Sequence, residues 1–158
     1  MPSSRIYWDA DVFLSYINGT SGRADVIAEL LHKSKQGEIE IVTSTISMVE
    51  VAFAATEKAG KLLDRETEDA IDALWADRGA VKLIEVDQLV NKEARALMRI
   101  GLPKSWRLKA MDAIHLATAK LSGAGELNTY NLCDFEKFSE ALGIIIREPY
   151  LEQSMLGL

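Results

Sequence analysis

Acidic side chains stand at places in this sequence where an ordinary core would have none. The segment YWDADVF (7–13) puts Asp9 and Asp11 directly after a short apolar run that predicts a core strand. Burying one carboxylate without a partner costs several kcal/mol or forces it to bind a proton. Two aspartates at this point therefore indicate a site that needs a positive group to complete it.

Three further acids lie at comparable places along the chain. Glu50 lies about one turn into a predicted helix, Asp112 opens the most apolar helix, and Asp134 follows a short predicted strand. In open parallel sheets, ligands bind beyond the carboxyl ends of the strands. We therefore expect Asp9, Glu50, Asp112 and Asp134 to meet at that edge of one sheet.

The elements that must position these acids alternate between strand and helix. Strands are predicted at 5–8, 39–43, 81–86, 126–130 and 143–149. Helices are predicted over 20–35, 47–60, 65–77, 87–101, 111–123 and 134–142. Thr20 or Ser21 is available to cap the first helix, Asp87 caps the fourth, and Gly60 and Gly123 follow helix ends. The alternation predicts an α/β fold with a central parallel β-sheet flanked by helices on both faces.

The composition favours one globular domain and limits the classes of function. The chain has 158 residues, of which 48% are hydrophobic and 27% charged, and its formal net charge is −6. It therefore has no global basic field for nucleic acid, although a local basic strip or bound cations can replace one. The single cysteine, Cys133, excludes an intramolecular disulfide and a multi-cysteine zinc site, and we expect it to be inert. With no predicted signal peptide or membrane span, we expect a cytoplasmic protein.

A cluster of four carboxylates requires a cation. Two carboxylates 4 Å apart repel by roughly 4 kcal/mol at an effective dielectric constant of about 20. Because the sequence has no cysteine pair and no histidine cluster, one or two oxygen-seeking ions, Mg²⁺ or Mn²⁺, are the natural choice. Such ions activate water and stabilise the charge that develops on a phosphodiester under attack.

Four motifs, in order, resemble those of PIN-domain nucleases. YWDADVF resembles their opening strand, SMVEV their second acidic motif, MDAIHLATA the third and TYNLCDF the fourth, over about 5–147. Within the family, the size of the chain looks most like VapC-type toxins of toxin–antitoxin pairs. The resemblance implies a single PIN-like domain over 1–158 that is an Mg²⁺- or Mn²⁺-dependent endoribonuclease, with a cognate antitoxin as partner. Its catalytic, metal-binding acids would be Asp9, Glu50, Asp112 and Asp134.

Two polar residues near these acids have supporting roles by the same resemblance. The position of Asp11 is usually a small polar residue in the family, which implies that Asp11 accepts backbone N–H groups and orients Asp9. Asn131 shares the fourth ligand role with Asp134 or takes it over, and the sequence leaves this choice open.

Basic residues and one histidine precede or follow Asp112. A strip that could bind RNA phosphates consists of Arg99, Lys104, Arg107 and Lys109. The alternative is that this strip is an ordinary solvated loop. His115, one turn after Asp112, is expected to be a structural histidine rather than a general base, because metal-activated water needs no imidazole. Three tryptophans are expected to serve packing: Trp8, Trp75 and Trp106.

Each acid also has an ordinary interpretation. Asp9 could be a turn residue at a strand end, Glu50 could face solvent, and Asp112 and Asp134 could be N-caps. Apolar residues on the helices at 20–35 and 47–60 could form a homodimer face as readily as the core.

Two other functions compete with the nuclease. A PIN-like module without catalysis would bind RNA or act as a scaffold, but it would have no reason to keep four mutually repelling acids. A haloacid-dehalogenase-type phosphatase also begins with a strand that ends in Asp-x-Asp. That family expects Thr or Val where this chain has Phe13, and a later Gly-Asp pair that this sequence lacks.

Overall fold

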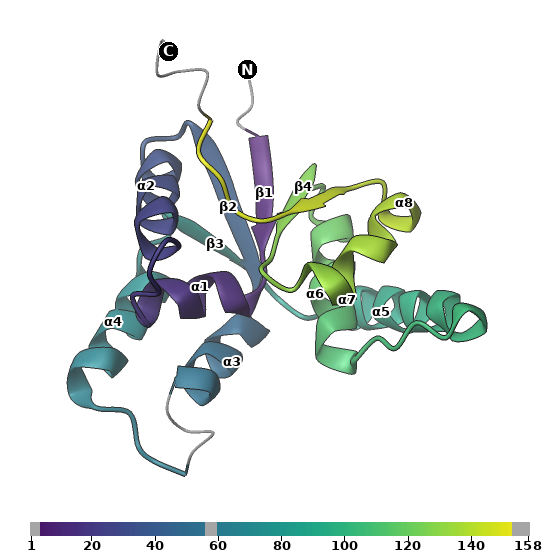
Figure 1. Ribbon diagram of the computed structural model, residues 1–158, viewed down its shortest axis with the longest axis horizontal. Helices are drawn as coiled ribbons and strands as arrows, with labels where there is room; N and C mark the ends of the chain where they lie inside the picture. The colour runs from purple at the N-terminus through teal and green to yellow at the C-terminus, as the bar shows by residue number, and fades with distance from the viewer. Residues whose placement is uncertain (1–3, 56–59, 153–158) are drawn as a thin grey trace.

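Five parallel strands form one open sheet in the computed structural model, which describes residues 4–55 and 60–152. The strands are β1 (Ser4–Trp8), β2 (Ile39–Ser44), β3 (Val81–Ile84), β4 (Glu126–Asn128) and β5 (Ile145–Arg147). Their order across the sheet is β3-β2-β1-β4-β5 (Figure 1). The α/β class and the parallel sheet predicted from the sequence are thus confirmed.

The central strand β1 places alternate side chains on opposite faces of the sheet. Tyr7 pairs with Val42 of β2 and Leu127 of β4, and these three residues belong to one buried cluster. Its neighbour Trp8 belongs to a second cluster. Successive strand residues point to opposite faces, so a strand covered on both sides is apolar throughout.

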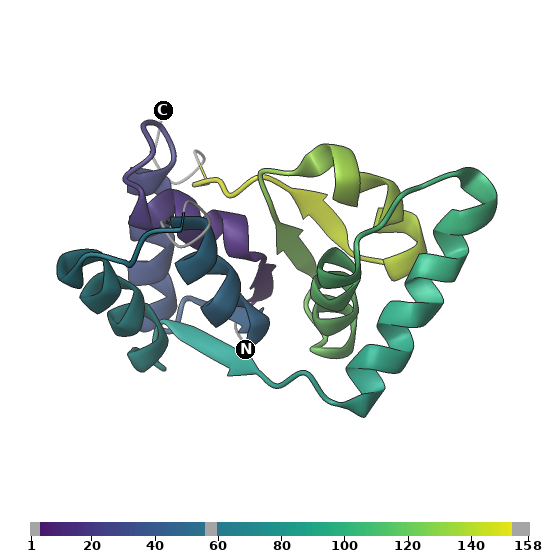
Figure 2. The same ribbon diagram turned by 90° about the horizontal axis from the view of Figure 1, so that it is seen from below.

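Helices cover both faces of this sheet. They are α1 (Ala10–Ile17), α2 (Ala24–Lys35), α3 (Ile46–Ala55), α4 (Arg65–Ala76), α5 (Gln88–Gly101), α6 (Ala110–Leu121), α7 (Leu132–Phe135) and α8 (Ser139–Leu142). Short 3₁₀ turns lie at Leu102–Lys104 and Glu136–Phe138. Figure 2 shows α1 to α4 on one side of the sheet and α5 to α8 on the other.

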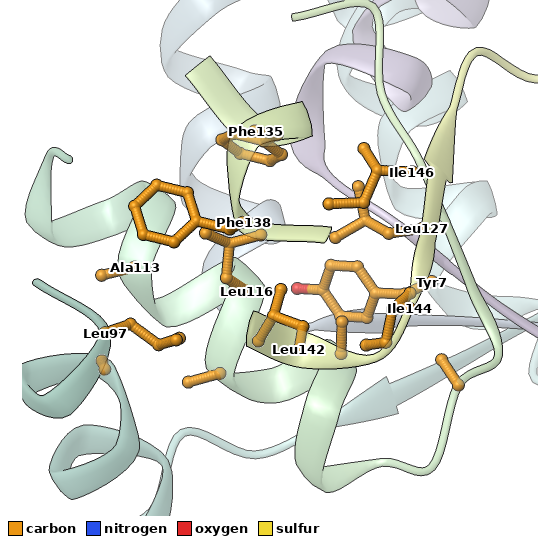
Figure 3. Close-up of a cluster of buried hydrophobic side chains, with 14 of the residues drawn as sticks. Tyr7, Leu97, Ala113, Leu116, Leu127, Phe135, Phe138, Leu142, Ile144 and Ile146 are labelled. Atoms are coloured by element: carbon orange, nitrogen blue, oxygen red, sulfur yellow. The ribbon is translucent and has the colours of Figure 1, made fainter. Parts of the chain in front are cut away.

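Each face has its own core. On the α1–α4 side, Phe13 packs edge-on against Trp8 and Trp75, with ring centroids 5.4 and 5.1 Å apart. On the other side, helix α6 contributes Ala113 and Leu116 to a cluster with Tyr7 and the other residues labelled in Figure 3, where the Tyr7 hydroxyl is a polar atom among hydrocarbon side chains. Trp106 packs edge-on against Phe138 at 5.3 Å, so all three tryptophans serve packing as predicted.

The segment after β1 differs from the prediction, which left it as a connection before a helix at 20–35. Residues Ala10–Ile17 form helix α1 instead. Val12 and Phe13 are buried, and Tyr16 and Ile17, four residues further on, pack against the same cluster, so one helical face is apolar. Asp9 is the residue immediately before this helix.

Other element ends also differ from the prediction. Helix α2 begins at Ala24 after Arg23, with no side-chain cap, so neither Thr20 nor Ser21 is its N-cap. The helix predicted over 134–142 is three short turns, and the last strand is only Ile145–Arg147. Helix α3 is described to Ala55, and residues 56–59 of its predicted end lie outside the described residues.

Two helix ends agree with their sequence signals. The Asp87 carboxylate accepts the Val90 backbone N–H at 2.9 Å and so caps α5 as predicted. Gly123 follows α6 with φ of +77°, a left-handed conformation that favours glycine. No helix in the described parts of the chain is long and apolar enough to cross a membrane.

Gly101 at the end of α5 offers a test of the packing that positions the following loop. A Cβ there would lie 2.9 Å from the Trp106 carbonyl oxygen and 3.1 Å from its Cβ. We expect Gly101→Ala to destabilise the protein by roughly 1–3 kcal/mol through overpacking. Each kcal/mol should lower the melting temperature by about 2–4 °C.

The matched control is Gly125→Ala, because a Cβ at Gly125 meets nothing within 4 Å. Thermal unfolding followed by circular dichroism should separate the two variants. Equal melting temperatures for both would show that the contact with Trp106 is not tight.

Candidate active site

The crevice between β1 and β4 is the place where this sheet reverses its direction of winding. The chain leaves β1 toward α1 on one face and leaves β4 toward α7 on the other. Ligands of open α/β sheets bind outside the carboxyl ends of strands at such a point. A hollow of about 280 Å³ lies there, lined by Asp9, Ala10, Asp11, Leu14, Glu50, Phe53, Ala54, Asp112, His115 and Asn131.

Asp9 is the buried carboxylate of this hollow, and only 5% of its surface is exposed. Its Oδ2 accepts a hydrogen bond from the Thr129 hydroxyl at 2.7 Å, whereas Oδ1 is buried without a hydrogen-bond partner among the described residues. Burial raises the pKa of Asp9 well above its usual value, and the neighbouring Asp11 carboxylate raises that pKa further. A cation would satisfy the orphaned oxygen and remove this cost.

Thr129 ties the loop after β4 to both aspartates. Its hydroxyl lies 2.7 Å from Asp9 Oδ2 and 3.2 Å from Asp11 Oδ2, and it accepts the Asn131 backbone N–H at 2.9 Å. Asp11 Oδ1 accepts the backbone N–H of Tyr130 at 3.2 Å. Asp11 was expected to accept backbone N–H groups, and its donors in the structure belong to a loop more than 100 residues away in the chain.

Glu50 and Asp112 approach the hollow from two helices. Glu50 does not simply face solvent, since its Oε1 lies 2.5 Å from His115 Nε2. Asp112 lies in the first turn of α6, after Lys109 at the N-cap position, so it is not a capping residue. Burial raises the pKa of the Asp112 carboxyl; His115 and Lys109 lower it, while the charges of Glu50 and Asp134 raise it.

Asn131 and Asp134 lie together at the start of α7. The Asn131 side-chain amide donates to Asp134 Oδ2 at 2.9 Å. Asn131 holds the N-cap position and lines the hollow, whereas Asp134 lies inside α7 and is not part of the lining. Asp134 is nevertheless close enough for its charge to act on Asp112. The pair therefore stays a joint candidate for the fourth position.

The donor set of the hollow fits a hard divalent cation. Its acidic residues offer only oxygen atoms, which Mg²⁺ and Mn²⁺ prefer. Within residues 4–55 and 60–152, no three His, Cys, Asp or Glu side chains already form a metal-binding group. Asp9 Oδ1 has no partner among the described residues, and the pKa values of Asp9 and Asp112 are raised first by burial and also by neighbouring carboxylates, so a positive ion would stabilise both acids.

The basic strip lies beside this site, on the chain that leads into α6. Arg99, Arg107 and Lys109 line a second hollow of about 590 Å³, and the Lys104 ammonium lies 4.4 Å from the centroid of the Trp106 ring. All four basic side chains are exposed, and none forms an ion pair with a described residue. They are therefore available to an external anion.

Two residues of the site were missed by sequence reasoning. Thr129 stands in the motif TYNLCDF, but no role was assigned to it although a hydroxyl directly after a strand is a usable signal. Tyr7 was counted only as a core residue, yet its hydroxyl lies 2.6 Å from Nδ1 of His115, which is itself buried.

Comparison with known proteins gives one family and several similar structures. The family model of the PIN domain matches residues 6–140. Comparison with curated protein sequences gives no significant match.

The similar solved structures share the fold of this chain at low identity. DNA-bound VapBC from Salmonella typhimurium has a TM-score of 0.68 at 15% identity, covering 93% of this chain and 99% of that chain. A toxin–antitoxin complex from Klebsiella pneumoniae has a TM-score of 0.62 at 22% identity, covering 93% of this chain and 99% of that chain. VapC20 from Mycobacterium tuberculosis is described as a toxin that cleaves the sarcin–ricin loop. Its TM-score is 0.64 at 15% identity, and the match covers 86% of this chain and 94% of that chain. Together with a family model that spans most of the sequence, these matches lead to one conclusion: this chain belongs to the PIN domain family.

Proposed function

We propose that this protein is a metal-dependent endoribonuclease that cuts RNA phosphodiester bonds as the toxin of a toxin–antitoxin pair. The observation that carries the proposal is Asp9, a buried carboxylate with one unpartnered oxygen, in a hollow that Glu50 and Asp112 also line. The similar structures include toxin–antitoxin complexes and a toxin that cleaves the sarcin–ricin loop, which favours the same reading.

The residues of the hollow would have different roles in such a reaction. Asp9, Glu50 and Asp112 would hold one or two Mg²⁺ or Mn²⁺ ions, with Asp134 or Asn131 as the fourth member. When bound, the cation supplies an activated water and stabilises charge on the phosphodiester. The Thr129 hydroxyl fixes the direction of the Asp9 carboxylate, and Asp11 ties the loop after β4 to the start of α1.

The strip of Arg99, Lys104, Arg107 and Lys109 would bind phosphates that flank the cleaved bond. Lys109 immediately precedes α6, the helix of Asp112, so a strand of RNA on the strip would lead into the hollow. A local strip of this kind explains how a chain of net charge −6 can bind an anionic substrate.

A protein partner would cover the apolar side chains beside the hollow. Helix α3 exposes Met48, Val49 and Phe53 by 42%, 69% and 50%. Contiguous exposed apolar side chains mark interaction sites. We propose that an antitoxin or a second copy of the chain covers this part of α3.

The first prediction concerns the reaction itself. The purified protein should cleave single-stranded or structured RNA in Mg²⁺ or Mn²⁺, and EDTA should abolish the cleavage. The reason is that the carboxylates repel a phosphate unless a cation lies between them. Gel analysis of labelled RNA measures this, with p-nitrophenyl phosphate as a parallel substrate. Full cleavage in EDTA would contradict the proposal. Metal-independent RNA binding without cleavage would favour the scaffold, and hydrolysis of p-nitrophenyl phosphate alone the phosphatase.

A second prediction separates the two aspartates of the opening motif. Asp9→Asn removes a metal-binding charge and should reduce the cleavage rate by orders of magnitude. Asp11→Asn keeps an oxygen that accepts the Tyr130 N–H and should reduce the rate about tenfold or less. Both rates are measured on one RNA at saturating Mg²⁺. If folded Asp11→Asn is as inactive as Asp9→Asn, Asp11 binds metal directly.

The third prediction is a metal-dependent gain in stability. Mn²⁺ or Mg²⁺ should raise the melting temperature, since the ion binds the native acids and not the dispersed acids of the unfolded chain. At 100 times the dissociation constant the gain is about 2.7 kcal/mol. Asp112→Asn should reduce the shift at equal metal concentration, whereas Asp64→Asn, on an exposed carboxylate that caps α4, should keep the shift in full. A full shift in Asp112→Asn would place Asp112 outside the site.

The last prediction of this group tests the basic strip. Replacing Arg107 and Lys109 by Ala should weaken RNA binding and reduce its salt dependence by up to ~0.7 in log–log slope for each lost single-strand phosphate contact. The control pair Arg78→Ala and Lys82→Ala removes the same charge near the start of the edge strand β3. Equal slopes for the two double variants in a salt titration would return the strip to the solvated-loop interpretation.

A further inference from the structure

We propose that Tyr7 and His115 are positioning residues that fix the Glu50 carboxylate through a directional chain of hydrogen bonds. This inference rests on the proposed function, because Glu50 is positioned there for a divalent cation. Neither residue would touch the ion or the RNA.

The chain of hydrogen bonds runs from the backbone of β2 to the edge of the hollow. The Ser44 backbone N–H donates to the Tyr7 hydroxyl at 3.2 Å, and this hydroxyl lies 2.6 Å from His115 Nδ1. On the other side of the ring, Nε2 lies 2.5 Å from Glu50 Oε1. Four elements (β2, β1, α6 and α3) thus contribute one group each.

The acceptor at the end of the chain of bonds sets the direction of its last bond. A carboxylate oxygen accepts, so the His115 Nε2–H donates to Glu50 Oε1. The Tyr7 hydroxyl accepts the Ser44 N–H, and we assign its own proton to the bond with His115 Nδ1.

Packing prevents either ring from leaving this arrangement. Tyr7 is fully buried, His115 is 1% exposed, and their rings meet edge-on with centroids 5.8 Å apart. Figure 3 shows Tyr7 enclosed by hydrocarbon side chains of the α5–α8 core. The donor offered to Glu50 is consequently as rigid as the core itself.

The consequence concerns one long side chain on an exposed helix. Glu50 is only partly buried, and a free glutamate would sample several rotamers. The bond to His115 uses Oε1, and the described residues provide no hydrogen bond to Oε2, which stays available. Outer hydrogen-bond partners of metal-binding side chains are typically worth 10–100-fold in affinity.

The first measurement reads the tautomer directly in the metal-free protein. The chain has only two histidines, so ¹⁵N-labelled imidazole signals can be assigned, with exposed His32 as internal reference. His115 should show a protonated Nε2 and an unprotonated Nδ1. A protonated Nδ1 in the wild type overturns the inference, as does a His115 signal that is the same in Tyr7→Phe.

The second measurement is Mn²⁺ affinity by calorimetry, with folding checked by circular dichroism. Tyr7→Phe, which removes only the hydroxyl, should weaken binding roughly 10–100-fold. Tyr16→Phe, a matched hydroxyl deletion outside the chain of bonds, should not change it. His115→Gln places an amide donor near Nε2 and should bind Mn²⁺ better than His115→Asn, which presents its amide to Tyr7 instead. A purely structural histidine would predict equal losses.

The outcomes distinguish this inference from the proposed function. Unchanged Mn²⁺ affinity in folded Tyr7→Phe and His115→Asn overturns the positioning role and leaves the nuclease intact. Wild-type protein that binds Mn²⁺ but leaves RNA uncut overturns the nuclease, while the order of affinities among the variants still supports the positioning role. Wild-type protein that binds no Mn²⁺ overturns both.

Discussion

The rest of this structure depends on one buried carboxylate that has an oxygen without a hydrogen-bond partner among the described residues. The unpartnered oxygen is Oδ1 of Asp9, at the end of the central strand and against the one crevice where the sheet changes its winding direction. Burial without a full set of partners is unfavourable. The surrounding fold must therefore be stable enough to keep that side chain in place, and two separate cores, one on each face of β1, meet at this strand.

The hydroxyl and the amide that orient Asp9 and Asp134 carry no charge. Thr129 donates to Asp9, the Asn131 amide donates to Asp134, and the His115 ring contacts Glu50. A lysine or arginine in any of these places would orient a carboxylate equally well, but it would also cancel the negative charge that attracts a cation. Uncharged donors fix the direction of a carboxylate and leave the net charge of the site unchanged. The basic side chains lie outside the hollow, from the end of α5 to the start of α6, and of these Lys109 lowers the pKa of Asp112 by its charge.

The sequence allowed much of this to be predicted, and the misses have physical causes. The strand-helix alternation predicted the sheet, and the strand-end rule brought Asp9, Glu50 and Asp112 to one hollow. Helix α1 was missed because it has only eight residues, and Asp9 and Asp11 at its start suggested a turn rather than a helix. The roles of Thr129 and Tyr7 were missed because their hydroxyls bond to side chains 120 and 108 residues away. The sequence near each residue does not show which distant side chain it bonds, although the place of Thr129 directly after a strand is a local signal.

The position of β4 beside β1 also sets the order in which the molecule can be completed. The bond between Thr129 and Asp9 spans 120 residues. Ribosomes add about 5–20 residues per second, so roughly 6–24 s separate the synthesis of these two residues. Only between the synthesis of Asp112 and that of β4, near the end of this interval, does the nascent chain contain Asp9, Glu50 and Asp112 without the partner strand that closes the crevice. A chain interrupted between Asp112 and β4 would therefore carry three of the acids without the Thr129 hydroxyl that orients Asp9.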